Sequence, residues 1–400
     1  MELVLASNFD PALVEQTRDL PISTFFGNFP TSLIGGGRPP RILPAIDPDG
    51  FRRHLAEVHR TGRKFYATLN SSDLGLREYS ADFSPQFRRE VDRLIDLGVD
   101  GFVVAVPALL EGLHRDYPDV GLSVSTFARI RTVAQAEYFL RLGADTVVIE
   151  EANRDFPLLR GLVRAGARVE LLVNQTCLHD CPFRFHHLNT SSLASQRDTA
   201  NPPWFELPLL ECGLELVRDP GQLVSGIFVR PEDLEVYEEI GVHRFKISGR
   251  NATTPWLVRV ARAYAARRYD GNLLDILSYV QNRAPRAALR QLAERGVAPK
   301  IVGPLADAFD ALASLEIDNG AFPAGFLRRV AATDCLHTSC AACGYCATVA
   351  RKVVRIRGRP LAEYEPPASL PDPRPLWPSF GAGEGAGRST NARPTPPVRG

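Results

Sequence analysis

Leu97-Gly98-Val99-Asp100-Gly101-Phe102-Val103-Val104 runs from the predicted end of a helix directly into a short apolar stretch. The same phrase recurs at 142–149, 165–173 and 240–247. In each copy the glycine stands where a helix C-cap needs a left-handed residue, and the run after it is typical of a buried parallel strand. Helix followed by strand, repeated along the chain, predicts a parallel sheet covered by helices.

Strands of this kind can be placed along the first 250 residues or so, with helices in most of the gaps. Eight or nine strands in that length favour a closed TIM-type (β/α) eight-stranded barrel, and an open doubly wound sheet is the alternative. One strand is surplus, and we interpret 224–229 as an insertion strand before the closing one. The predicted strands are 2–7, 22–27, 63–70, 101–106, 121–125, 146–150, 168–174, 224–229 and 244–248.

The pattern divides the chain into four parts. The barrel is predicted over 1–255, a helical extension over 256–330 and a cysteine-rich metal-binding element over 331–358. Residues 359–400 are rich in proline and glycine, a composition that cannot bury a core, so we expect a disordered tail.

The bulk composition narrows the classes of function. Of 400 residues, 44% are apolar and 23% charged, and the net charge is +1. That balance gives no electrostatic reason to expect binding to nucleic acid or to acidic membranes, and we leave nucleic acid open as a partner. The N-terminus lacks a signal-peptide pattern and no stretch approaches the ~18 apolar residues of a spanning helix, so we expect a cytoplasmic protein.

The cysteines form two groups. The first is Cys177-x-x-x-Cys181, followed at a distance by Cys212. The second contains four cysteines within twelve residues: Cys335, Cys340, Cys343 and Cys346. In a reducing compartment such clusters are more often metal ligands than disulfides, and thiolates hold zinc or iron–sulfur clusters. We therefore predict one or two four-iron four-sulfur clusters, with zinc as the alternative at the C-terminal site.

Polar residues at the carboxyl ends of the strands mark the expected active site, because a β/α barrel places its chemistry there. The strand before Cys177 ends at Asn174, which would put Cys177 and Cys181 at the barrel mouth. Three cysteines would leave one position open or filled by His179, His186 or His187, and zinc on the same cysteines competes with this assignment. The other strand-end residues are Asn70, Ser125, Glu150, Glu151, Lys246, Ser248 and Arg250.

A glycine run, Gly35-Gly36-Gly37-Arg38, follows the second predicted strand. Its backbone amides could cradle a phosphate or a carboxylate. The run lacks the phosphate-loop and dinucleotide signatures, so a flexible loop is the favoured interpretation. Neither a Ser-His-Asp signature nor a His-Glu-x-x-His motif is present.

Several phrases together resemble the collagenase-like peptidase family U32, across roughly residues 1–270. They are Lys64–Asn70, Leu122–Thr126, Val147–Glu151, Glu170–Asn174 leading to Cys177, Val229–Leu234 and Phe245-Lys246-Ile247-Ser248-Gly249-Arg250. The family was named for a proposed protease activity, and several bacterial members are implicated in oxygen-independent hydroxylation of ubiquinone precursors or RNA pyrimidines. Some of these carry four-iron four-sulfur clusters on four cysteines.

The resemblance implies that Cys177, Cys181 and Cys212 belong to a cluster ligand set and that Arg230, Lys246 and Arg250 are the family's basic positions. The chain departs from the family in the short spacing of its first cysteine pair, in lacking a fourth cysteine near Cys212 and in its C-terminal cysteine element. It looks like a divergent branch.

The leading functional hypothesis is an iron–sulfur enzyme that carries out oxygen-independent hydroxylation, or related redox chemistry, on a small anionic or RNA-linked substrate. An electron-transfer protein or a family paralogue is the expected protein partner. A peptidase and a non-catalytic, metal-stabilised partner subunit are the alternatives. Expected catalytic residues are Glu150, Glu151, Asn174, Arg184 and His187; expected substrate-binding residues are Asn70, Ser125, Arg230, Lys246 and Arg250.

Overall fold

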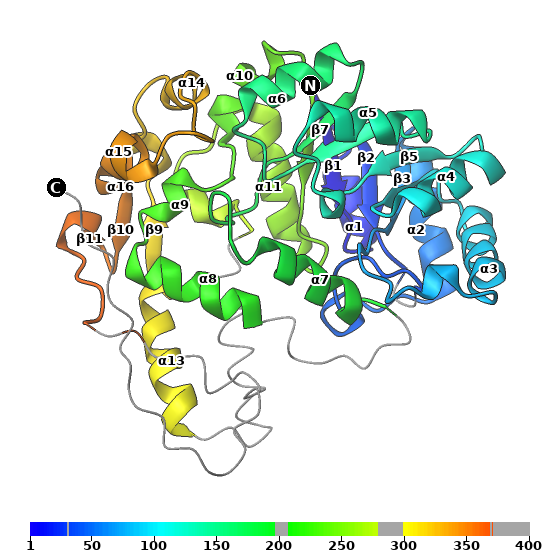
Figure 1. The fold of residues 1–400 in the computed structure, drawn as a ribbon, viewed down its shortest axis with the longest axis horizontal. Coiled ribbons are helices and arrows are strands. Elements are labelled where there is room, and N and C mark those ends of the chain that lie inside the picture. The colour runs from blue at the N-terminus through cyan, green and yellow to red at the C-terminus, as the bar shows by residue number, and fades with distance from the viewer. Residues whose placement is uncertain (30–31, 197–206, 279–298, 369, 371–400) are drawn as a thin grey trace.

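A closed barrel of eight parallel strands forms the centre of the molecule (Figure 1). The computed structural model describes residues 1–29, 32–196, 207–278, 299–368 and 370. Each strand pairs with the next, and β8 pairs with β1 to close the barrel. The strands are β1 (Glu2–Ala6), β2 (Ile22–Gly27), β3 (Lys64–Leu69), β4 (Gly101–Val104), β5 (Gly121–Val124), β6 (Thr146–Ile149), β7 (Arg168–Leu172) and β8 (Arg244–Ile247).

The predicted TIM-type fold is therefore confirmed, and so is the role of the repeated glycines. Gly98 and Gly143 follow helices and have positive φ angles of 106° and 104°, which an L side chain rarely adopts. Helices of the barrel wall are α1 (Pro11–Gln16), α2 (Pro48–Arg60), α3 (Phe83–Asp96), α4 (Pro107–Asp116), α5 (Val133–Arg141), α6 (Phe156–Arg164), α10 (Leu234–Glu238) and α11 (Thr254–Ala266). None of the helices in the described part of the chain is long and apolar enough to span a membrane.

The prediction of a surplus strand over 224–229 is wrong. Within 224–229 the chain begins as the end of a short helix, α9 (Gln222–Ser225), and continues as an extended segment that forms no strand. Its Val229 amide donates to the Val173 carbonyl at 2.8 Å, just beyond β7. Because β8 already pairs with both β7 and β1, the closed barrel has no edge that an extra strand could join.

Two of the predicted boundaries between parts of the chain also differ from those in the structure. Helix α11 crosses the expected border at 255/256 and contacts β1 and α1, so it belongs to the barrel wall. Residues at the start of the expected disordered tail form β11 (Arg359–Pro360) and a short 3-10 helix (Leu361–Glu363). The Tyr364 hydroxyl then donates to the Val217 carbonyl at 2.7 Å. Most of the predicted tail, 371–400, lies outside the described residues.

The C-terminal part packs on the long connection between β7 and β8. That connection carries α7 (Arg184–Ala194), α8 (Leu207–Arg218) and α9, and α13 packs on α8 while α16 packs on α9 (Figure 1). The predicted helical extension also contains a strand, because β9 joins β10 and β11 in a small antiparallel sheet. The elements are α13 (Pro299–Ala313), β9 (Leu315–Ile317), α14 (Phe326–Ala331), α15 (Cys340–Cys343), α16 (Tyr345–Val353) and β10 (Val354–Ile356).

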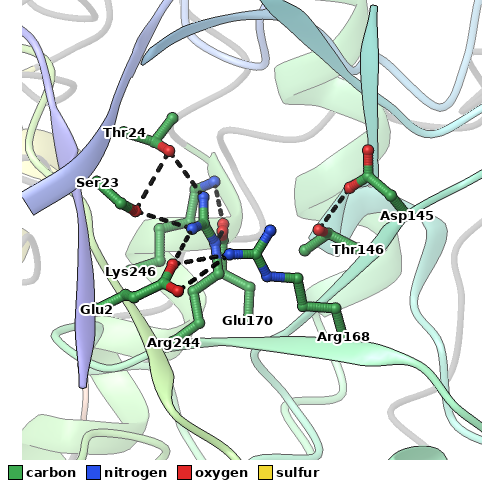
Figure 2. A network of polar contacts seen from close by, with 9 residues as sticks. All are labelled: Glu2, Ser23, Thr24, Asp145, Thr146, Arg168, Glu170, Arg244 and Lys246. Carbon is green, nitrogen blue, oxygen red and sulfur yellow. Dashed lines mark hydrogen bonds and ion pairs between the residues drawn. The ribbon is translucent and has the colours of Figure 1, made fainter. Parts of the chain in front are cut away.

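A buried network of charges fills the lower interior of the barrel (Figure 2). The Glu170 carboxylate accepts a hydrogen bond from Arg244 Nε at 2.6 Å and another from Lys246 Nζ at 2.6 Å. Arg244 also donates to Glu2 at 2.6 Å and to Thr24 at 2.9 Å. Burial opposes ionisation of Glu170, but the two cations outweigh it and lower the pKa of the carboxyl.

Glu170→Gln should therefore destabilise the fold strongly, since it removes the charge that compensates Lys246. Breaking a buried ion pair costs about 3–5 kcal/mol, whereas Arg168→Gln, which removes an exposed partner of Glu2, should cost at most ~1 kcal/mol. Urea unfolding followed by circular dichroism measures both. The Glu170 contribution should be present above the unfolded pKa of ~4.3 and be lost as the pH falls through the folded value. Equal losses in the two variants would contradict this prediction.

Candidate active site

Inward-facing polar side chains form a layer at the carboxyl ends of the barrel strands. Along β2 and just after it, Thr24 contacts Arg244, Phe26 lies under Lys246 and Asn28 accepts from Arg250. Every second residue therefore faces the interior, as the pleat requires, and the last of them lies at the mouth. The buried members of this layer are Asn28, Asn70, Ser125, Glu150 and Asn174.

Three of these predicted residues serve to hold the mouth together. Asn70 Nδ2 donates to Ser125 Oγ at 3.0 Å, which brings the ends of β3 and β5 together. Asn174 Nδ2 donates to the Ser248 carbonyl at 3.0 Å, and its Oδ1 accepts from the Ser248 amide at 2.8 Å. Both polar atoms of Asn174 are thus occupied in joining β7 to β8, so we interpret it as a positioning residue.

The two glutamates after β6 are paired with arginines. Glu150 accepts from Arg184, the first residue of α7, in a buried ion pair. Glu151 accepts from Arg129 Nε at 2.8 Å and lies 3.9 Å from Arg184 Nε. Arg184 also places Nη1 3.4 Å from the Cys177 sulfur. Glu150, Arg184 and Cys177 therefore meet at the mouth, as the sequence predicted.

Arg250 differs from these pairs because its partners are neutral. Its Nη1 donates to Asn28 Oδ1 at 2.7 Å and to Thr68 Oγ1 at 3.0 Å. Among the residues that the structure describes, no carboxylate forms an ion pair with it. Burial, together with the nearby charge of Arg38, lowers the pKa of Arg250 to about 9, so the guanidinium remains charged at neutral pH.

Arg38 is a mouth residue that sequence reasoning did not assign. The positive charge of Arg38 acts to lower the pKa values of Cys177, His187 and Arg250. The glycine run that precedes it is buried and hydrogen-bonded, which corrects the interpretation as a flexible loop: Gly37 N donates to Ser195 Oγ at 3.1 Å, and Gly35 O accepts from the Asn70 amide at 3.0 Å. The glycine run that precedes Arg38 is the sequence feature that could have identified it as a mouth residue.

The neutral groups of the mouth are Cys177 and His187. Burial raises the pKa of the Cys177 thiol to about 12, so it is protonated at neutral pH. Burial and the positive charges of Arg184 and Arg38 lower the pKa of His187 to about 3, so its imidazole is uncharged. Neither group is prepared for thiolate or imidazolium chemistry in this arrangement.

Two predicted substrate-binding residues lie elsewhere. Arg230 forms a two-pronged ion pair with Asp233, at 2.8 Å for both bonds, and its guanidinium stacks 4.4 Å from the Phe322 ring centroid. It therefore joins the barrel to the C-terminal part. Lys246 belongs to the buried network with Glu170, one inward position below the mouth. Residue type and position near a strand end suggested Arg230 and Lys246 as substrate-binding residues. Their orientation, however, depends on tertiary packing.

The predicted three-cysteine ligand set is not assembled. Cys177 and Cys181 are neighbours, whereas Cys212 lies on α8 within the hydrophobic core, with its thiol directed at the Leu209 carbonyl at 3.5 Å. Across the described residues, no three His, Cys, Asp or Glu side chains are grouped so that they could hold a metal ion. Cys212 lies on the apolar face of α8, and this position explains why it is buried.

The four C-terminal cysteines are close in space without converging on one centre. Burial and the thiols of Cys340 and Cys343 raise the pKa of Cys346, and Cys335 responds to the same neighbours. Arg154 donates to Cys346 and to the Val224 carbonyl at 3.0 Å, which ties this element to the barrel. A cavity of about 330 Å³ separates the element from the mouth, and its lining includes Glu151, His179 and Cys335.

Sequence reasoning also missed a buried serine–histidine pair. Ser7 Oγ lies 2.8 Å from His54 Nε2, behind the rings of Phe9, Phe51 and Phe65. Burial lowers the pKa of His54 to about 4. Ser7 directly follows β1 and His54 lies on α2, so spacing in the sequence offered no signal for the pair.

The exposure and pKa differences among the cysteines give a direct test. With a pKa near 12, Cys177 carries on the order of a thousandfold less thiolate at pH 7.5 than an ordinary cysteine of pKa ~8.5. Exposed Cys340 and Cys343 should therefore react with iodoacetamide long before Cys177 in chelator-treated protein. Peptide mapping by mass spectrometry measures the rates, and labelling of Cys177 at a rate similar to Cys340 would contradict the described environment.

Comparison with known proteins agrees with the family resemblance seen in the sequence. The family model described as peptidase family U32 matches residues 44–153. The uncharacterized protease MJ1657 of Methanocaldococcus jannaschii is 26% identical over 267 residues, which cover 64% of this chain and 78% of that protein.

Among solved structures, the U32 peptidase Mk0906 is 21% identical, with a TM-score of 0.46, over 62% of this chain and 92% of its own. Thiamine phosphate pyrophosphorylase from Pyrococcus furiosus is 8% identical, with a TM-score of 0.34, over 66% and 94%. With TM-scores below 0.5, these two likenesses say nothing about function. The family model and the archaeal relative both support the resemblance of this chain to peptidase family U32.

Proposed function

We propose that this chain is an enzyme that binds a small anionic substrate at the mouth of its barrel. The observation that carries the proposal is Arg250, a half-buried guanidinium whose hydrogen-bond partners are the neutral Asn28 and Thr68. Burying a cation without a counter-charge is expensive, and a fold tolerates it where a ligand supplies the charge. Arg38 adds a second cation beside it.

Neither of the two glutamates at the mouth pairs with Arg250. Glu150 is paired with Arg184, and Glu151 with Arg129. Arginine suits the remaining role because its planar fork pairs with carboxylate or phosphate oxygens in two-pronged fashion. Glu150 lies beside Cys177 and Arg184, and it is the group we assign to accept or return a proton during the reaction.

The reaction we propose is the oxygen-independent hydroxylation, or a related redox step, that the family resemblance implies. The spacing of the C-terminal cysteines in the sequence supports a soft metal or an iron–sulfur cluster there, which would supply electron transfer when bound, although their described side chains are not gathered around one centre in this structure. The first group does not fit a three-cysteine cluster, because Cys212 lies in the core of α8 and Arg184 lies against Cys177. We derive no step from a cluster there.

A peptidase is the alternative that the relatives' names suggest, and the Ser7–His54 contact is the feature that favours it. Both side chains are fully enclosed, with exposed fractions of 1% and 2%. His54 Nδ1 has no hydrogen-bond partner among the described residues, so no third group orients the imidazole. A peptide bond could not reach Ser7 behind the three phenylalanine rings. We therefore favour the anion-binding enzyme.

Arg250→Gln should abolish anion binding without weakening the unliganded fold, because it removes an uncompensated charge. In the full-length protein, acetate and inorganic phosphate should raise the melting temperature, and at 100 times the dissociation constant the stabilisation is about 2.7 kcal/mol. The variant should lose that increase. Arg53→Gln, an exposed arginine on α2, is the matched control and should retain it. Anion stabilisation that persists in Arg250→Gln would refute the proposed site.

The cysteine element should account for bound metal separately from the barrel. Replacing Cys340 and Cys343 together by serine should remove the iron and sulfide, or the zinc, of one centre from anaerobically purified protein. Cys212→Ser is the control, and we expect unchanged metal because Cys212 packs in the hydrophobic core. Elemental and sulfide analysis gives the result, and a metal content insensitive to the double substitution would show that this element binds none.

A further inference from the structure

The glycine loop, residues 32–37, packs on the two residues that hold Arg250. The Arg250 Nη1 atom donates to Asn28 Oδ1 at 2.7 Å and to Thr68 Oγ1 at 3.0 Å. A Cβ atom on Gly36 would lie 2.7 Å from Asn28 Cβ and 2.7 Å from Thr68 Oγ1. Because there is no room even for a methyl group between them, the loop backbone limits where both acceptors can lie. The position of the loop therefore affects the position of the guanidinium.

Glu90, on helix α3 of the barrel wall, anchors the beginning of this loop. Its Oε1 accepts from Ser32 Oγ at 2.7 Å, and its Oε2 accepts from the Leu33 amide at 2.7 Å. Ser32 Oγ in turn accepts from the Gly35 amide at 3.0 Å, one residue before Gly36. Hydrogen bonds to a carboxylate are among the stronger kinds, and these two restrain both a side chain and the backbone of the loop.

Two strand and helix ends hold the rest of the loop. The Gly37 amide donates to Ser195 Oγ at 3.1 Å, just beyond α7, and the Gly35 carbonyl accepts from the Asn70 amide at 3.0 Å, just beyond β3. Figure 1 shows α3 at the outer edge of the barrel, so the contact with Glu90 reaches the loop from the wall and not from a strand end. The wall and the mouth are thus connected through the loop.

We infer that Glu90 is a positioning residue for anion binding by Arg250, and that it acts through the glycine loop. The inference rests on the proposed function, because it concerns the same guanidinium. Without the anchor, Asn28 and Thr68 are less restrained, and the anion must order them when it binds. Ordering one side chain on binding lowers the affinity about two- to tenfold.

The direction of the effect separates positioning from a simple effect of charge. If only the charge of Glu90 mattered, it would repel an anion, and Glu90→Ala would tighten anion binding. Positioning predicts the opposite, so the dissociation constants of acetate and of inorganic phosphate should rise about two- to tenfold in this variant. Isothermal titration calorimetry on the full-length protein at constant ionic strength measures both constants.

A conservative variant and a matched control complete the set. Glu90→Gln removes the charge but can keep both contacts, because its Oε1 accepts from the Leu33 amide and its Nε2 donates to the second lone pair of Ser32 Oγ. It should bind the anions nearly as tightly as the unsubstituted protein. Asp92→Ala removes another carboxylate of α3, whose hydrogen bond comes from the Tyr117 hydroxyl at 2.6 Å, and it should leave binding unchanged.

Two further variants test the route through the loop. Ser32→Ala breaks the link from the loop side and should weaken anion binding as Glu90→Ala does, so the inference can be tested even if Glu90→Ala does not fold. Loss of Glu90 should cost less affinity when Asn28 is already alanine, because effects that act through one residue do not add. Melting curves of each variant without ligand establish that the fold is retained.

The outcomes separate the inference from the proposed function. Unchanged or tighter binding in Glu90→Ala, with binding still abolished in Arg250→Gln, would leave the anion site in place and overturn the role of Glu90. An equal loss of affinity in Asp92→Ala or in Glu90→Gln would overturn it too, as would effects of Glu90→Ala and Asn28→Ala that simply add. Failure of the unsubstituted protein to bind either anion would refute both the positioning role and the function on which it rests.

Discussion

A closed barrel of parallel strands turns every second side chain into an interior that contains little water, and each polar group there needs a partner. In this chain the lower interior meets that requirement with Glu170, held between Arg244 and Lys246. In the polar layer above it, Asn70 donates a hydrogen bond to Ser125, and Asn174 donates one to the Ser248 carbonyl just beyond β8. The position of each inward residue along its strand thus decides whether it stabilises the barrel or faces the mouth.

The two levels of the interior differ in charge. Below, the carboxylates of Glu170 and Glu2 compensate the cations that contact them (Figure 2). At the mouth, Glu150 is already paired with Arg184, and Arg250 is bound by neutral oxygen atoms. A buried cation without a counter-charge is costly, so we propose that the mouth receives an anion beside Arg250. This contrast is the physical basis of the proposed function.

The long connection between β7 and β8 links the mouth to the C-terminal part. Helix α7 contributes Arg184 to the mouth at one end and Ser195, just beyond its other end, to the glycine loop. Helices α8 and α9 carry α13 and α16 on their outer side (Figure 1). Arg154, next to the mouth, reaches Cys346 as well as the Val224 carbonyl. The cysteine element is therefore held by the same insertion that completes the mouth.

Much of this organisation could be predicted from the sequence, because it depends on short-range rules. Glycine at a helix C-cap and an apolar run after it, as at Gly98 and Gly143, are local requirements, and repetition of the phrase was sufficient to predict the barrel. Strand-end positions likewise predicted that Glu150 and Asn174 would lie at the mouth, with Cys177 directly after Asn174. The resemblance to family U32 agrees with the family model and with the archaeal relative.

Long-range contacts decided the rest. Arg230 and Lys246 share their residue class with Arg250, yet one pairs with Asp233, one with Glu170, and the third faces the mouth. Arg38 enters the site because Gly36 allows the backbone to pack on Asn28 and Thr68, which no spacing rule encodes. Cys212 looked like a ligand until α8 placed it in the core. The sequence by itself determined the barrel and the strand ends that form its mouth; the direction and pairing of each charged side chain were decided by the tertiary structure, because they depend on which distant residues the closed barrel brings into contact.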